Sequence, residues 1–255
     1  MSYIDNCEKY KSTIIDNFEE AQNIKGILSQ DLIDKLVLFQ FNNTKRVKWS
    51  STSRNIQPIV NIDNIFKDIP EIKEIFNELI GDFYKYHTGN FYITTMLHDA
   101  HVDLLTEQEC NTKDFEWTDN IIPYKSAIIP LLVNDDADAY TAFFRERHIG
   151  YSVTFDKAGY SYDKNSDYNI AREYPKFYRY GENRNSEFLM RNPLVPKKNV
   201  EDFDYENIFK FKPGNIMLFD ACQIHMSVIR DWKTERDIDF LKNRINIQFY
   251  REVND

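Results

Sequence analysis

From Phe91 onward the chain is a series of short β-rich runs, and this series limits the fold more than any other feature. The runs are rich in Ile, Val, Phe, Tyr and Thr and are separated by polar residues or by turn-forming Gly, Pro, Asn and Asp. Such spacing predicts a sandwich or barrel rather than alternating strands and helices. The predicted strands are FYITTML from residue 91, AIIPLLV from 127, AYTAFF from 139, YSVTF from 151, NIMLF from 215 and INIQFY from 245.

Residues 1–90 have a different texture and are predicted to form a mainly helical layer. Ser29 is a candidate N-cap because apolar residues at helical spacing follow it. A second helix is predicted from Pro70, with Ile72, Ile75, Phe76 and Leu79 on one face. Its apolar stripe needs a surface to pack on, and the strands that follow can provide it. His87 is expected at the end of this helical region.

We expect one domain over residues 1–255, with a β core over residues 91–255. A stretch from about residue 157 to 207 interrupts the strand series and holds many tyrosines and charges without a clear period. Long irregular insertions in compact domains are commonly lids over a site or partly disordered. We interpret this one as an inserted lid.

Composition narrows the classes of partner. The net charge of −9 disfavours a nucleic acid, whose binders usually carry a basic stripe. The longest apolar stretch is far shorter than the roughly 20 residues of a membrane-spanning helix. The 3 cysteines are widely spaced, and the N-terminus lacks the pattern of a secretory signal, so a cytoplasmic protein is expected.

The motif HDAHVD at residues 98–103 is the first candidate for chemistry. His101 and Asp103 are two residues apart, so in an extended chain both side chains lie on one face and can reach one metal ion. His225 follows the run KPGNIMLFD, which reads as a turn and a buried strand. Two imidazoles and one carboxylate leave three positions open, as in non-haem Fe(II) oxygenases, whereas zinc sites prefer tetrahedral closure.

Arg244 begins RINIQFY, a run in which polar and apolar residues alternate. Period two places Arg244, Asn246 and Gln248 on one face of a strand. A guanidinium inside a barrel is costly without an anion, and its planar fork suits a carboxylate. We therefore expect the distal carboxylate of a bound co-substrate at Arg244, with Asn246 as a possible assistant.

With these residues in place, the sequence resembles the Fe(II)/2-oxoglutarate-dependent dioxygenase superfamily, of the prolyl-hydroxylase and phytanoyl-CoA-hydroxylase type. The pattern HxD, a distant His and a late Arg corresponds to His101, Asp103, His225 and Arg244. The resemblance covers roughly residues 91–252. It implies a mainly β fold with supporting helices (α+β), whose core is a double-stranded β-helix (a jelly-roll, cupin-like barrel).

The resemblance also implies the cofactors and the reaction. Fe(II) would be held by the two histidines and the aspartate, with 2-oxoglutarate and O2 as co-substrates. The products would be succinate, CO2 and a small molecule hydroxylated or desaturated at an unactivated C–H bond. The acidic composition and the predicted lid suggest a small-molecule substrate, such as an amino acid or a derivative, with a peptide side chain as the alternative; Arg145 or Arg147 could meet its anionic group. The oligomeric state cannot be read from the sequence.

Several alternatives stay open at this point. His98 could replace His101, as in related halogenases that lack the carboxylate ligand, although Asp103 favours hydroxylation. Arg236 lies at the usual family distance from His225, while Arg244 is 19 residues away, but Arg236 is in a polar stretch that reads as a loop. A cupin-like metal oxygenase that does not use 2-oxoglutarate, or a non-catalytic jelly-roll binding protein, would share the fold.

Overall fold

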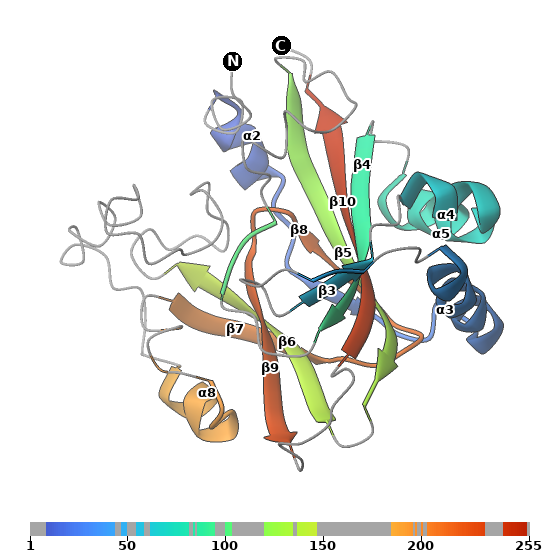
Figure 1. The fold of residues 1–255 in the computed structure, drawn as a ribbon. Coiled ribbons are helices and arrows are strands. Elements are labelled where there is room, and N and C mark those ends of the chain that lie inside the picture. Colours follow the sequence, from blue (N-terminus) through green and yellow to red (C-terminus); the bar gives the residue numbers. More distant parts are fainter. Residues whose placement is uncertain are drawn as a thin grey trace.

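Two antiparallel sheets form the body of the protein (Figure 1). The computed structural model describes residues 9–43, 47–49, 55–58, 62–81, 84, 86–94, 100–103, 120–134, 137–146, 185–195, 197, 200, 203–232 and 242–253. The large sheet has seven strands in the order β1-β8-β5-β10-β4-β3-β2, and the small sheet has three in the order β7-β6-β9. The predicted fold class, a mainly β jelly-roll core with supporting helices, is confirmed.

The large sheet is built on four long or central strands. These are β4 (Tyr86–Thr94), β5 (Ile121–Val133), β8 (Ile216–Asp220) and β10 (Lys242–Glu252). β10 lies between β4 and β5, and Pro130 of β5 faces a register shift at Arg244. Such an irregularity accommodates a residue without an N–H donor. The short strands β1 (Gln22–Ile24), β2 (Val47–Trp49) and β3 (Asn55–Pro58) complete this sheet.

The small sheet consists of β6 (Ala137–Glu146), β7 (Phe203–Lys210) and β9 (Ile224–Trp232). Phe143 from its β6 strand packs with Ile128, Met217 and Phe219 of the large sheet in one cluster, so the two sheets face each other. β7 and β9 were not predicted from the sequence, and β7 begins inside the predicted insertion. The predicted strand at 151–155 lies outside the described residues.

Helices cover the outer face of the large sheet (Figure 1). They are α3 (Gln30–Asn43), α4 (Ile62–Asp68) and α5 (Pro70–Ile80), and their buried side chains join those of β5, β8 and β10 in one core cluster. The predicted cap is confirmed, since Ser29 Oγ accepts the Leu32 N–H at 3.2 Å. The expectation for His87 is wrong: it lies in β4, with its ring 4.6 Å from that of Phe66.

A further apolar cluster lies on the outer side of the small sheet and extends to the ends of β5 and β10. α8 (Asn185–Arg191) contributes Phe188 and α2 (Lys11–Asp16) contributes Ile14 to this cluster, which also holds Ile224 of β9 and Ile121 of β5. The first ninety residues thus combine the expected helices with three short strands and the start of β4. None of the described helices has the length and apolar character that crossing a membrane requires.

Candidate metal centre

His101 and Asp103 lie on a short extended segment beside β9, and packing explains their orientation. Ala100 and Val102 are buried in the cluster on the outer side of the small sheet. Because side chains alternate along an extended chain, His101 and Asp103 project to the opposite side, between the two sheets. The same alternation applies to His225, whose neighbours Ile224 and Met226 belong to that outer cluster.

The two histidines are held together through their backbones. The His101 N–H donates to the His225 carbonyl and the His225 N–H donates to the His101 carbonyl, both at 2.9 Å. The Asp103 N–H donates to the Ala221 carbonyl at 3.1 Å. These bonds fix the register of the HxD segment against the start of β9 and the residues just before it.

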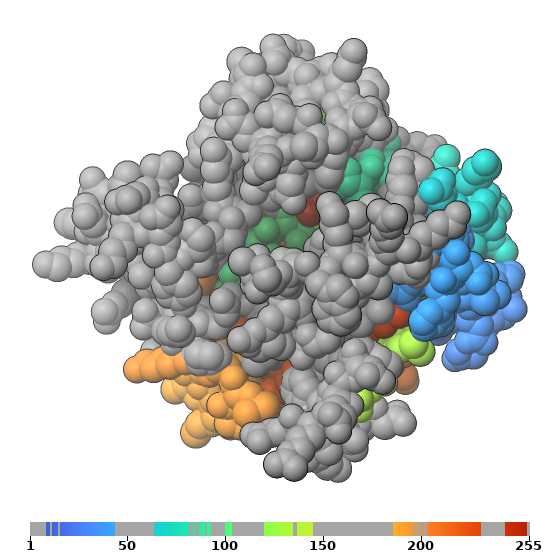
Figure 2. Space-filling model, in the orientation of Figure 1, coloured from blue at the N-terminus to red at the C-terminus, as the bar shows by residue number. Residues whose placement is uncertain are grey.

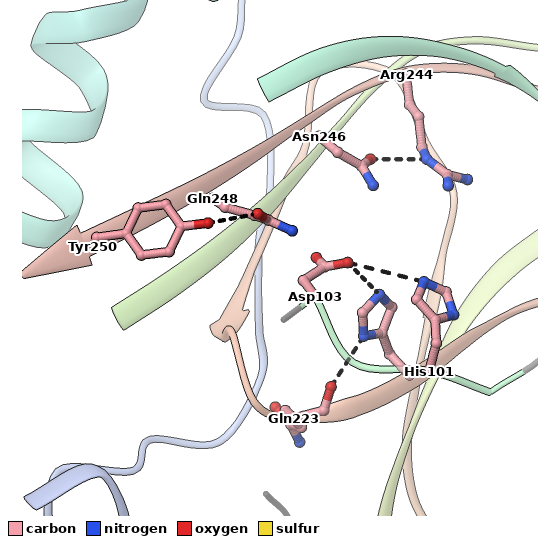
Figure 3. Close-up of polar contacts among 8 residues, drawn as sticks. His101, Asp103, Gln223, Arg244, Asn246, Gln248 and Tyr250 are labelled. Carbon is pink, nitrogen blue, oxygen red and sulfur yellow. Dashed lines mark hydrogen bonds and ion pairs between the residues drawn. The ribbon is translucent and has the colours of Figure 1, made fainter. Parts of the chain in front are cut away.

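The three predicted ligands converge, as Figure 3 shows. Asp103 Oδ1 lies 3.9 Å from His101 Nε2 and 3.7 Å from His225 Nε2. The candidate ligand atoms all lie within 4.8 Å of one another, so each can reach an ion placed among them. One carboxylate and two imidazoles on one side of an ion leave further positions open for a co-substrate.

The surroundings of His225 favour its neutral form, with Nε2 as the atom that can bind a metal ion. Its Nδ1 lies 3.0 Å from the Gln223 carbonyl, an acceptor that requires a proton on Nδ1 and leaves the Nε2 lone pair toward Asp103. Burial and, to a lesser extent, the neighbouring His101 lower the pKa of His225 from 6.5 to about 4, although Asp103 raises it. The rings of Phe143 and Phe219 lie 6.1 Å and 4.6 Å from its ring and shield it.

His101 is more accessible than His225. Its side chain is 25% exposed, against 3% for the His225 side chain. In the space-filling view, green atoms from the described residues 86–94 and 100–103 are visible near the centre of this face (Figure 2). His101 is therefore the more exposed of the two histidine ligand candidates.

β10 supplies the wall opposite the triad (Figure 3). Arg244 is only 4% exposed, and its Nε donates to Asn246 Oδ1 at 2.8 Å. Its guanidinium carbon lies 5.4 Å from the centre of the Tyr92 ring. Burial lowers the pKa of Arg244, whereas Tyr92 and Asp103 raise it, so the guanidinium lies within electrostatic range of the triad. The predicted Arg244 and Asn246 are therefore brought together beside the metal-ligand candidates.

The side chains of the other predicted residues are not among those that the structure describes. Arg145 lies in β6, paired with Asp204 in β7, and its side chain is not described. Arg147, His98 and Arg236 lie outside the described residues. Gln248 lies on the same face of β10 as Arg244, as the alternation along RINIQFY predicts, and its Oε1 accepts a hydrogen bond from the Tyr250 hydroxyl at 2.8 Å, a partner that sequence reasoning missed.

Comparison with known proteins gives structural neighbours at low identity. Pseudomonas putida prolyl-4-hydroxylase has a TM-score of 0.43 and 9% identity, covering 99% of this chain and 98% of its own. The epimerase SnoN from nogalamycin biosynthesis, in complex with Fe3+, alpha ketoglutarate and nogalamycin RO, has a TM-score of 0.48 and 10% identity, with coverages of 97% and 82%. HygX from Streptomyces hygroscopicus with iron bound has a TM-score of 0.41 and 11% identity, and the match covers 96% of this chain and 86% of HygX.

No family model matches the sequence, and no curated protein matches it.

Proposed function

We propose that this protein is a non-haem Fe(II)- and 2-oxoglutarate-dependent oxygenase that acts on a small molecule. One observation carries the proposal: His101, Asp103 and His225 converge on one point between the sheets, opposite a buried arginine on β10. A carboxylate and two neutral imidazoles are the donor set of Fe(II) oxygenases with open coordination positions. The planar fork of the buried guanidinium beside them matches a carboxylate, which a dicarboxylic co-substrate provides.

Each residue has a distinct role in this proposal. The triad holds the ion, and Arg244 binds the distal carboxylate of 2-oxoglutarate, while Asn246 fixes the guanidinium by accepting its Nε–H. Phe143 and Phe219 exclude water around His225. When bound, the iron and the oxo acid supply the oxidising power toward a C–H bond, with O2 consumed and succinate and CO2 released.

The substrate and the reaction type rest on the sequence. We infer hydroxylation or desaturation of a small molecule, such as an amino acid or a derivative, because Asp103 occupies the position that a halide would need. Arg145 and Arg147 remain candidates for its anionic group. The three unpatterned cysteines favour a cytoplasmic protein.

Anaerobic titration with Fe(II) and 2-oxoglutarate tests the proposal. The wild-type protein should develop the metal-to-ligand charge-transfer band of the ternary complex, and His225→Ala should lose it. Arg244→Ala should need about 100-fold more 2-oxoglutarate, because it loses charge-assisted hydrogen bonds to a carboxylate. The absence of the band in the wild type, or an undiminished band in His225→Ala, would contradict the proposal.

The same variants separate the alternatives. A metal oxygenase that does not use an oxo acid would bind Fe(II) through the triad, but Arg244→Ala would leave its activity unchanged. A screen of small metabolites for oxygen-dependent succinate release then identifies the substrate class, and a binding protein would release none.

A further inference from the structure

The inner wall of the large sheet carries a second polar pair beyond Arg244. Gln248 of β10 is the Cα partner of Ser126 of β5. Residues directly opposite each other in an antiparallel pair have their side chains on the same face. Gln248 shares the face of Arg244 and Asn246, which looks toward Asp103 (Figure 3). Ser126 therefore also faces the space between the sheets.

Packing of β5 supports this orientation of Ser126. Ala127 and Ile129 join the cluster under the helices, on the outer side of the sheet. Ile128 joins the cluster between the two sheets. Since side chains alternate along a strand, Ser126 projects inward with Ile128.

The amide of Gln248 is held in one orientation. Its Oε1 accepts hydrogen bonds from the Tyr250 hydroxyl at 2.8 Å and the Thr88 hydroxyl at 3.3 Å. With the oxygen end occupied, the Nε2 donors face away from Tyr250, and Figure 3 shows this nitrogen directed into the space in front of Asp103. The two hydroxyls thus present Gln248 to the site as a donor.

The Ser126 hydroxyl is the second unusual feature. The residue is 0% exposed, and within the described ranges its Oγ is one of two buried side-chain atoms without a hydrogen-bond partner. Buried polar groups in native proteins are nearly always hydrogen-bonded, because leaving one unpaired is destabilising. Alanine would fill this position at no such cost, so the hydroxyl points to a ligand.

We propose that Ser126 Oγ and Gln248 Nε2 form a second anchor for 2-oxoglutarate, at the carboxylate next to its keto group. This inference rests on the proposed function. An oxo acid that chelates a metal uses its keto oxygen and one carboxylate oxygen, which leaves the other carboxylate oxygen buried and in need of donors. Arg244 would hold the distal end of the diacid, and the Ser126–Gln248 pair would hold the proximal end, with Asn246 between them along β10.

The experiment compares two oxo acids that differ at one end only. Anaerobic Fe(II) protein is titrated with 2-oxoglutarate and with 2-oxopentanoate, which lacks the distal carboxylate, and the charge-transfer band gives each Kd. Ser126→Ala should raise both Kd values about tenfold, since one hydrogen bond to a charged group is lost. Gln248→Glu should raise both about 100-fold, because it places a carboxylate against a carboxylate. Arg244→Ala should weaken 2-oxoglutarate alone.

Two controls separate loss of a donor from loss of structure. Ser126→Thr keeps the hydroxyl and should keep both Kd values within about threefold, the range of small packing changes. Ser126→Ala should raise the melting temperature of the metal-free protein, because the unpaired buried hydroxyl is removed. A residue with a structural role alone would lower that temperature and leave the Kd values unchanged.

Each failure has its own signature. A wild-type protein that binds neither oxo acid overturns the proposed function itself. Wild-type binding with both Kd values unchanged in Ser126→Ala and Gln248→Glu overturns the second anchor and leaves the proposed function standing. If Ser126→Ala and Gln248→Glu raised the Kd of 2-oxoglutarate alone, Ser126 and Gln248 would contact the distal carboxylate. That result would also overturn the proposed anchor at the carboxylate next to the keto group.

Discussion

The two faces of the large sheet differ in chemistry although the same strands build both. Ile245, Ile247 and Phe249 of β10 face the helices and are 0% exposed in an apolar cluster. The residues between them, Arg244, Asn246 and Gln248, face the triad and form hydrogen bonds. One face stabilises the fold and the other presents donors to a ligand. Because side chains alternate along a strand, neighbouring residues of β10 can serve different purposes: one residue stabilises the core, and the next faces the ligand site.

The largest expected effect on stability comes from the outer face. Phe249 is fully buried, with its ring 4.9 Å from that of Phe76 and 5.0 Å from that of Tyr84. Phe249→Ala should lower the free energy of unfolding by about 4 kcal/mol, as loss of a buried aromatic side chain does. Urea denaturation measures this change. Phe41→Ala, at a 65% exposed position on α3, is the matched control and should change it by less than about 0.5 kcal/mol.

An intermediate effect is expected at Asp220, a charged residue on the outer face. Desolvation by burial raises the pKa of Asp220 to about 6 from 3.8, although Lys125 and the hydrogen bond from the Cys222 N–H lower it. The folded state therefore binds the proton more tightly than the unfolded state. Protonated Asp220 therefore stabilises the folded state below about pH 4. As the pH rises through 6 and Asp220 loses its proton, the free energy of unfolding should fall by about 3 kcal/mol.

Asp220→Asn tests that expectation. The amide oxygen can still accept the Cys222 N–H, and Lys125 keeps its ion pair with Glu19 at 2.9 Å. Relative to the wild type, the variant should gain stability at pH 7 and lose this advantage below about pH 4. Denaturation curves at pH 4, 5, 6 and 7 measure the difference. A difference that stays constant with pH would refute the raised pKa.

The smallest effect is expected on the inner face, at Asn246. Asn246→Ala removes the acceptor that holds Arg244 Nε, so the guanidinium loses its fixed orientation. The Kd for 2-oxoglutarate should rise about tenfold, with the free energy of unfolding changed by less than about 1 kcal/mol. Binding of 2-oxopentanoate should not change, because it has no group at Arg244. Equal weakening of both acids would mean that Asn246 contacts the shared end of the ligand.

Much of the site was predictable because its chemistry needs few residue types at fixed spacings. The two-residue spacing of His101 and Asp103 sets a shared face, and the alternation after Arg244 predicts a polar strand face. Their convergence with His225 depends on strand pairing across the barrel, which no local pattern determines. The convergence of His225 with His101 and Asp103 was therefore predicted only from the resemblance to a known family.

The remaining features depended on tertiary information. Ser126 stands between Lys125 and the apolar run that begins at Ala127, and only the β5–β10 register and the unpaired hydroxyl reveal its position. β9 was missed although Ile224, Met226 and Val228 alternate with His225 and Ser227 as in a half-buried strand, because His225 was interpreted only as a ligand that follows the preceding strand. His87 was misplaced since the helix pattern before it ends earlier, at Ile80, and β4 begins at Tyr86.

The reciprocal backbone bonds between His101 and His225 make the spacing of the two imidazoles independent of the length of chain that joins them. Insertions, deletions or segment exchanges between His101 and His225 therefore change the surroundings of the metal centre without changing the distance between the two imidazoles. Natural divergence, or an engineer seeking a new substrate range, can therefore rework that long connection while the coordination geometry is inherited intact.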